Sequence, residues 1–229
     1  MINIQNVFNQ FCTFLQNRKG IMTEDNIRYY WFAAMLQEDL DLNNYTLEYP
    51  YSNLNVITPG ILQNEELDLL YENNTENEFF CFEMKFHRNN TNKTFAKTSA
   101  AGGIFNDLQR LQQIANPGAR RFFLYVTDSI MYVYLSNNNG KDLDYSQLLM
   151  DFCALQAGNA ITLNFNNAPL SPSTFKDSAN KSLNIKTLPE IQNLLLLYED
   201  DFPCISPSFA NNNNNNNNNN CHVRLYEIL

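Results

Sequence analysis

Apolar residues near the start of the chain recur with the spacing of two amphipathic helices. In residues 3–17 they lie three or four apart and so share one face of a predicted helix: Ile4, Val7, Phe8, Phe11, Phe14 and Leu15. Thr23 is a favourable N-cap, and Glu24 and Asp25 follow it in the first turn. These residues predict a second helix from Thr23 to about Leu40.

The pattern then changes to the two-residue alternation of β-strands. TLEYPY (46–51) predicts a short strand suited to a sheet edge, because Pro50 has no amide hydrogen to donate. ELDLLYE (66–72) and Phe79–His87 predict two further strands, joined by a connection rich in turn-forming residues.

A predicted helix and two apolar segments come next. Phe95–Ala115 has helical spacing, and Asn116-Pro117-Gly118 ends it. RFFLYVTD (121–128) predicts a strand, with IMYVYLS (130–136) as its hairpin partner or its continuation past a bulge.

The C-terminal third has a weaker pattern. We expect a helix over residues 145–157, a strand at ITLNF (161–165), a leucine-rich helix over Leu188–Tyr198 and a final strand at HVRLYEIL (222–229). The asparagine run 211–220 cannot form a core, so residues 209–220 are expected to be a disordered loop, unless the run stands for undetermined sequence.

These elements favour one mixed α/β domain over residues 1–229. The order helix, three strands, helix, strand indicates a mixed sheet rather than a doubly wound parallel one. The expected core covers about residues 20–136, and residues 137–229 elaborate on it.

Composition narrows the class of protein. The chain is 44% hydrophobic but has no run of about 18 apolar residues, so no membrane-spanning helix is expected. Its N-terminal segment lacks the basic start and apolar block of a signal peptide. Five scattered cysteines without a CxxC pair favour reduced thiols, and we therefore expect a cytoplasmic protein.

The net charge of −9 argues against a general nucleic-acid coat protein, but the charge is uneven. Between Met84 and Thr127 the only acid is Asp107, and the bases are Lys85, Arg88, Lys93, Lys97, Arg110, Arg120 and Arg121. This excess of positive charge indicates either a face that binds an anion or a solvated loop and helix surface.

The segment FFCFEMKFHR (79–88) contains two charges, Glu83 and Lys85, in an otherwise apolar strand. Burying ions is costly unless each is paired or bound. Alternation puts both side chains on one face of the strand. If this strand forms a hairpin with the preceding one across residues 73–78, paired residue numbers sum to 151, and Asp68 lies opposite Glu83.

Two carboxylates this close repel each other, so one binds a proton or a cation lies between them. Mg²⁺ prefers a few carboxylates and keeps water ligands for phosphate oxygens. A neighbouring lysine can orient an attacking water or help to deprotonate it. The alternative is an ordinary Glu–Lys pair on a solvated sheet face, and the aromatic residues around Glu83 and Lys85 favour the metal site instead.

In this ordered set of residues the chain resembles the PD-(D/E)XK nuclease superfamily. Asp68 is similar to that family's first acidic residue, and Glu83-Met84-Lys85 to its (D/E)-x-K motif. The helix at Thr23-Glu24 resembles the family's first helix, and AAGGIFNDLQRL (100–111) the helix after the active-site hairpin. One departure is Leu67, which stands where the family motif has proline.

The resemblance implies a restriction-endonuclease-like αβββαβ core, with helices on both faces of a central mixed β-sheet. It implies a Mg²⁺-dependent nuclease, for which Mn²⁺ is a substitute, and products with 5′-phosphates. Asp68 and Glu83 would hold the metal together with the Met84 carbonyl, and Lys85 would position the nucleophilic water. Glu24 would either assist catalysis or only stabilise the start of its helix.

The expected partner is nucleic acid, DNA before RNA, and a homodimer is left open. Phosphate contacts are expected from Arg88, Lys93, Lys97 and Arg110, and Asp107 is expected to form an ion pair with Arg110 one turn away. Two alternatives stay open: a catalytically inactive nucleic-acid-binding or interaction module on the same fold, and a metal-dependent enzyme for another phosphate ester.

Overall fold

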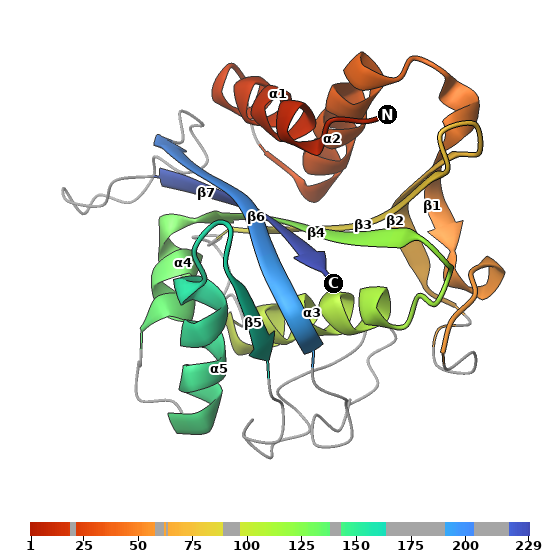
Figure 1. Ribbon diagram of the computed structural model, residues 1–229. Helices are drawn as coiled ribbons and strands as arrows, with labels where there is room; N and C mark the ends of the chain where they lie inside the picture. The colour runs from red at the N-terminus through yellow and green to blue at the C-terminus, as the bar shows by residue number, and fades with distance from the viewer. Residues whose placement is uncertain are drawn as a thin grey trace.

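The computed structural model describes residues 1–18, 22–57, 62, 64–88, 97–137, 143–163, 191–203 and 220–229. In these ranges a seven-stranded sheet lies between two layers of helices (Figure 1). One layer consists of α1 (Ile4–Gln16) and α2 (Glu24–Glu38), and the other of α3 (Lys97–Gln112), α4 (Ser129–Ser136) and α5 (Leu143–Ala154). The predicted mixed α/β class is confirmed.

The strands have the order β1-β2-β3-β4-β7-β6-β5 across the sheet. Their bounds are β1 (Tyr45–Pro50), β2 (Glu66–Asn73), β3 (Glu78–His87), β4 (Ala119–Asp128), β5 (Ala160–Leu163), β6 (Ile191–Pro203) and β7 (Asn220–Ile228), and two short 3-10 helices, η1 (Leu42–Asn44) and η2 (Tyr51–Asn53), flank β1. β3 and β4 are parallel and the other neighbours antiparallel. β1 lies at an edge of the sheet, as predicted from Pro50.

The segment 130–136, predicted to be a strand, is a helix instead. Its tyrosines and valine favour β-structure, but the Asp128 side chain accepts the Met131 amide hydrogen at 2.8 Å and caps α4. Met131 and Leu135, four residues apart, are both buried. A cap and one buried helical stripe outweigh a weak intrinsic strand preference.

The prediction of a leucine-rich helix over 188–198 is also wrong. From Ile191 onward this segment is strand β6, which pairs with β5 and β7. Leu194 and Leu196 pack on one face of the sheet, whereas Leu197 packs on the other. A run of leucines fits a strand that is covered on both faces, and its periodicity alone does not distinguish it from a buried helix.

The predicted loop 209–220 lies almost entirely outside the described residues. Asn220 is the exception, since it is the first residue of β7. The final strand predicted over 222–229 is confirmed, and β7 lies between β4 and β6. The C-terminal segment therefore supplies strands β5, β6 and β7 to the same sheet.

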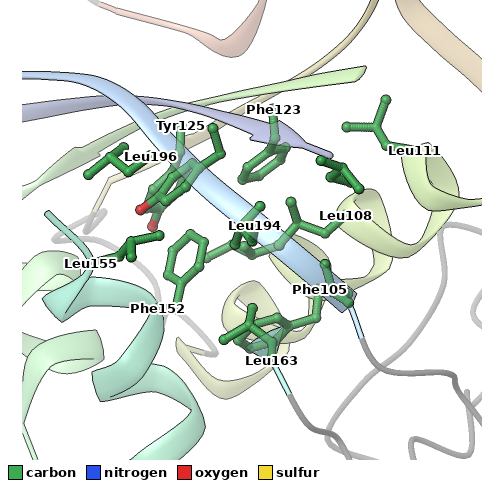
Figure 2. Packing of buried hydrophobic residues seen from close by; sticks show 14 of the residues in the cluster. Phe105, Leu108, Leu111, Phe123, Tyr125, Phe152, Leu155, Leu163, Leu194 and Leu196 are labelled. Carbon is green, nitrogen blue, oxygen red and sulfur yellow. The ribbon is translucent and has the colours of Figure 1, made fainter. Parts of the chain in front are cut away.

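Each face of the sheet has its own hydrophobic core. One core packs α1 and α2 against Phe80, Phe82, Met84 and Phe86 of β3. The other packs α3, α4 and α5 on the opposite face, where Phe105, Phe123, Tyr125 and Phe152 lie close together (Figure 2). Cys12 and Cys81 are buried thiols without a disulfide bond. None of the described helices combines the length and apolarity needed to cross a bilayer.

The described bases of the segment 84–127 do not gather on one face. Arg120 forms two hydrogen bonds with Glu227 and lies over Phe122, on the side of the sheet that α1 and α2 cover. Arg110 lies on α3 on the opposite side of the sheet. A continuous anion-binding face is therefore not formed by these residues alone.

Phe82 lies in the core between the sheet and helices α1 and α2, and its replacement should lower the stability of the fold. Its ring is fully buried, stacks on Phe122 at a centroid distance of 5.0 Å and contacts Trp31 at 5.6 Å. We expect Phe82→Ala to lower the free energy of unfolding by about 3–5 kcal/mol in urea titrations, because it leaves a cavity. Val133→Ala, at a half-exposed position of α4, is the control and should change it by less than about 0.5 kcal/mol. Equal losses in both variants would contradict this account.

Candidate functional site

The predicted register between β2 and β3 is confirmed. Leu69 pairs with Phe82, Leu70 with Cys81 and Tyr71 with Phe80, so paired numbers sum to 151. The pairing ends at Leu69 and Phe82, one step before Asp68 would face Glu83. Beyond this last pair the acceptor is a side chain: Asp68 Oδ2 accepts the Met84 amide hydrogen at 2.6 Å.

The side chains of β2 do not alternate regularly at this point. Regular alternation would put Leu67 on the face of Leu69 and Tyr71, but Leu67 packs in the opposite core together with Leu70. On β1, Leu47 pairs with Leu69 and Tyr49 with Leu67, and Glu48 between them has a φ of 52°. This irregular backbone of β1 lies beside the change of face in β2.

The start of α2 brings a second set of charges to the strand. The Thr23 hydroxyl caps the helix by accepting the backbone amide hydrogen of Asn26. The Asn26 side-chain oxygen accepts the backbone amide hydrogen of Thr23 in return. Glu24 and Arg28 are one turn apart and 3.3 Å apart at their charged atoms. Arg28 Nη2 reaches Asp68 Oδ1 at 2.7 Å, which links α2 directly to β2.

Glu83 is held from the other side by η2 and α3. The Tyr51 hydroxyl donates to Glu83 Oε1 at 2.8 Å, and Arg110 Nε lies 3.3 Å from the same oxygen. Arg110 also contacts Glu65 at 2.9 Å and forms the predicted ion pair with Asp107. The Arg110 guanidinium is thus directed at three carboxylates.

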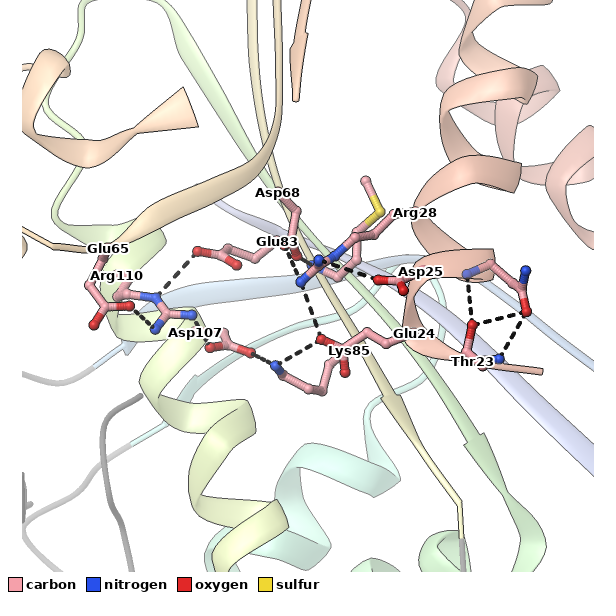
Figure 3. A network of polar contacts seen from close by, with 12 residues as sticks. Thr23, Glu24, Asp25, Arg28, Glu65, Asp68, Glu83, Lys85, Asp107 and Arg110 are labelled. Carbon is pink, nitrogen blue, oxygen red and sulfur yellow. Dashed lines mark hydrogen bonds and ion pairs between the residues drawn. The ribbon is translucent and has the colours of Figure 1, made fainter. Parts of the chain in front are cut away.

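Lys85 lies between the two helices that flank the site (Figure 3). Its Nζ is 3.5 Å from Glu24 Oε1 on α2 and 3.3 Å from Asp107 Oδ2 on α3. The side chain of Lys85 keeps about a fifth of its surface exposed, whereas the Asp107 side chain is 3% exposed. Glu24 therefore both opens its helix and reaches the site, so its two expected roles are compatible.

The network carries more negative than positive charge. It contains three bases, Arg28, Lys85 and Arg110, and six acids, Glu24, Asp25, Glu65, Asp68, Glu83 and Asp107. Burial raises the pKa of Asp68 to about 6, although Arg28 opposes this. Burial raises the pKa of Glu83 to about 8; the Arg110 charge opposes this rise, and the charges of Asp68 and Asp107 add to it. Asp107 raises the pKa of Lys85, so Lys85 is a cation at neutral pH.

The donor set has the chemistry that Mg²⁺ prefers, namely carboxylate and carbonyl oxygens. Asp68 Oδ2 accepts the Met84 amide hydrogen, and Tyr51 and Arg110 contact Oε1 of Glu83 rather than Oε2. Within the described ranges, no three His, Cys, Asp or Glu side chains form a group arranged to hold a metal. Arg28 Nη2 already contacts Asp68 Oδ1 and would compete with a metal for that carboxylate.

The structure brings most of the residues expected at the site into one network, which contains Asp68, Glu83, Lys85, Glu24 and Arg110 (Figure 3). Arg88 comes directly after β3 and is half-buried. Lys97 is the first residue of α3, but its side chain and all of Lys93 lie outside the described part of the chain.

Several residues of the network were not expected there, among them Asp25 and Glu65. Arg28 was recognisable as a partner of Glu24 by its i, i+4 spacing on the same helix. Asp107 was expected only as the partner of Arg110, since nothing in the local pattern pointed to Lys85. Tyr51 had no sequence signal, because its approach to Glu83 depends on the turn of the chain after β1.

The chain matches no family model, no curated protein and no solved structure. Its function must therefore be inferred from its own residues and their geometry.

His87, two positions beyond Lys85, should make stability depend on pH. Burial and the Lys85 charge lower the pKa of His87 to about 3, whereas an unfolded histidine titrates near about 6.5. Between these values only the unfolded chain binds the proton, so the free energy of unfolding falls as pH decreases from about 6.5, by at most about 1.4 kcal/mol per pH unit. Urea unfolding of wild type and His87→Asn between about pH 5 and 7.5 measures this, and parallel curves would show that His87 does not contribute.

Proposed function

We propose that this protein is a Mg²⁺-dependent nuclease that hydrolyses phosphodiester bonds of nucleic acid, with DNA as the expected substrate. The observation that supports it is the convergence of Asp68 of β2 with Glu83 and Lys85 of β3, in a network with six acids and three bases. A bound divalent cation would offset part of this excess negative charge, and Lys85 lies within the same network.

The element order gives independent support. α2, β1, β2, β3, α3 and β4 succeed one another in the chain, which is the αβββαβ order of a restriction-endonuclease-like core. The motif residues lie on β2 and β3, and the helix with Glu24 reaches them from one face of the sheet. We therefore extend the proposal to the fold family, with β5, β6 and β7 as additional strands.

Each residue has a distinct role in the proposed reaction. Asp68 and Glu83 would hold Mg²⁺ together with the Met84 carbonyl, and Glu24 would orient Lys85. A bound Mg²⁺ would supply charge neutralisation at the scissile phosphate. Lys85, a cation at neutral pH, would orient the attacking water and stabilise negative charge on the phosphate rather than act as a base. The water oxygen bonds to phosphorus as the bond to the leaving oxygen breaks; the attacking water releases a proton to solvent, and the leaving oxygen takes one up from solvent.

One observation favours a second candidate, a non-catalytic nucleic-acid-binding or interaction module. Arg28 lies 2.7 Å from Asp68, and Lys85 contacts two carboxylates, so the network is also coherent as a purely structural cluster of ion pairs. In that case the charges would fix α2 and α3 to the sheet, and metal would not be required.

Cleavage of supercoiled plasmid and of single-stranded DNA tests the proposed function. Wild type should cleave with Mg²⁺ or Mn²⁺ and not with EDTA. Lys85→Met should lower the rate by at least about 100-fold, since it removes a charge that stabilises the transition state. Asp68→Asn, which retains an acceptor for the Met84 amide, should lower it to a similar extent.

Glu72→Gln is the matched control for Asp68→Asn. Glu72 is an exposed acid on the same strand, β2, and lies outside the charged network. It should cleave at the wild-type rate. Wild-type rates in Lys85→Met and Asp68→Asn, with both proteins folded by circular dichroism, would exclude the proposed nuclease site.

Metal titration separates the nuclease from the non-catalytic module. By isothermal calorimetry, wild type should bind Mn²⁺ at one site, and Asp68→Asn should bind it at least about 10-fold more weakly, because a direct ligand is changed. Glu72→Gln should bind like wild type. Absence of any Mn²⁺ binding to wild type would favour the structural cluster.

A further inference from the structure

Asp107 contacts two cations of the network, Lys85 and Arg110. It lies on α3, is 2% exposed, and contacts Arg110 through Oδ1 and Lys85 Nζ through Oδ2 at 3.3 Å. Arg110 in turn contacts Glu83. One buried carboxylate therefore joins Lys85 to the group that holds Glu83.

The two oxygens of Asp107 are not equivalent. Oδ1 is shared with Arg110 on the same helix, which fixes the rotation of the carboxylate. Oδ2 is buried and has no hydrogen-bond partner in the described part of the chain, so its favourable contact is the ion pair with Lys85. A buried carboxylate oxygen is costly without a partner, and this cost favours keeping Lys85 beside it.

Lys85 needs such a partner to be held in place. A lysine side chain has a flexible four-carbon stem and a compact charge, so a single contact leaves it free to move. Glu24 lies on the opposite side of Nζ, at 3.5 Å, and is itself shared with Arg28. Asp107 is the closer and more deeply buried of the two acids.

We propose that Asp107 is a positioning residue for Lys85: Asp107 of α3 and Glu24 of α2 hold the ammonium between them, in the place from which Lys85 acts on the substrate. This inference rests on the proposed nuclease function. By this inference α3 influences the reaction indirectly. Asp107 acts through Lys85 and does not contact the metal or the phosphate.

Steady-state cleavage of supercoiled plasmid with Mg²⁺ tests the assignment. Asp107→Asn keeps the size of the side chain and removes its charge, and we expect kcat to fall about 10- to 100-fold, as for residues that orient a catalytic group. KM for plasmid and the Mg²⁺ concentration for half-maximal rate should stay within about twofold of wild type, because Asp107 is neither a proposed metal ligand nor a proposed phosphate contact. Adding Asp107→Asn to Lys85→Met should cause no further fall in kcat.

Glu227→Gln is the matched control. Glu227 is also buried and pairs with an arginine, Arg120 at 2.6 Å, but on β7 away from the charged network. A purely structural effect of losing a buried carboxylate should appear in both variants. Unchanged kcat in Asp107→Asn, or an equal fall of kcat in Glu227→Gln, would overturn the assignment.

A second measurement does not require activity. In ¹H–¹⁵N spectra of lysine ammonium groups, a lysine held between two carboxylates exchanges its protons slowly, and Lys85→Met identifies the signal by its loss. Wild type should show a slowly exchanging Lys85 signal that disappears in folded Asp107→Asn. A wild-type Lys85 that exchanges as fast as exposed lysines would overturn the positioning role.

The outcomes separate this inference from the function on which it rests. A wild-type protein that cleaves neither plasmid nor single strands with Mg²⁺ or Mn²⁺ overturns the nuclease proposal itself. An active wild type whose rate does not depend on Asp107 overturns only the role of Asp107.

Discussion

The contact between the Asp68 carboxylate and the Met84 amide is the interaction on which the site depends. It lies just beyond the last pair of the β2–β3 ladder and provides the amide of β3 with an acceptor from a side chain. A charge-assisted bond of this kind is shorter and stronger than one between neutral groups. It fixes Asp68 beside the Glu83-Met84-Lys85 segment, and it sets where Arg28 must lie to reach the other oxygen of Asp68.

From this point the two helix layers act on the strand from opposite sides. α2 supplies Glu24 and Arg28, and α3 supplies Asp107 and Arg110. Both helices are also anchored by apolar cores, with Trp31 and Phe105 among their buried residues. The burial of large apolar faces offsets the desolvation of the charges between them, which ion pairs alone seldom achieve. Packing and electrostatics are therefore coupled through the same two helices.

Sequence was sufficient wherever one local signal dominated. The alternation in Phe79–His87 and the register with β2 placed Asp68, Glu83 and Lys85 together, because a one-residue slip would have moved the whole apolar set to the wrong face. It failed where tertiary context decided. Tyr134 and Val133 favour a strand, yet the Asp128 cap makes their segment a helix, and Leu194–Leu197 favour a helix, yet two covered faces make theirs a strand. The approach of Tyr51 and Asp107 to the site depends on distant segments and had no local signature.

The place of β7 has a consequence for how the polypeptide matures. Its partner β4 is made long before it, as the sequence separation of 107 between the bonded residues Arg120 and Glu227 shows. Until β7 emerges from the ribosome, β4 is an unpaired edge rich in aromatic residues, which is a template for association with other chains. Closing such distant pairs is also slow. The nascent protein thus passes through an interval in which this apolar strand depends on other segments or on chaperones for protection.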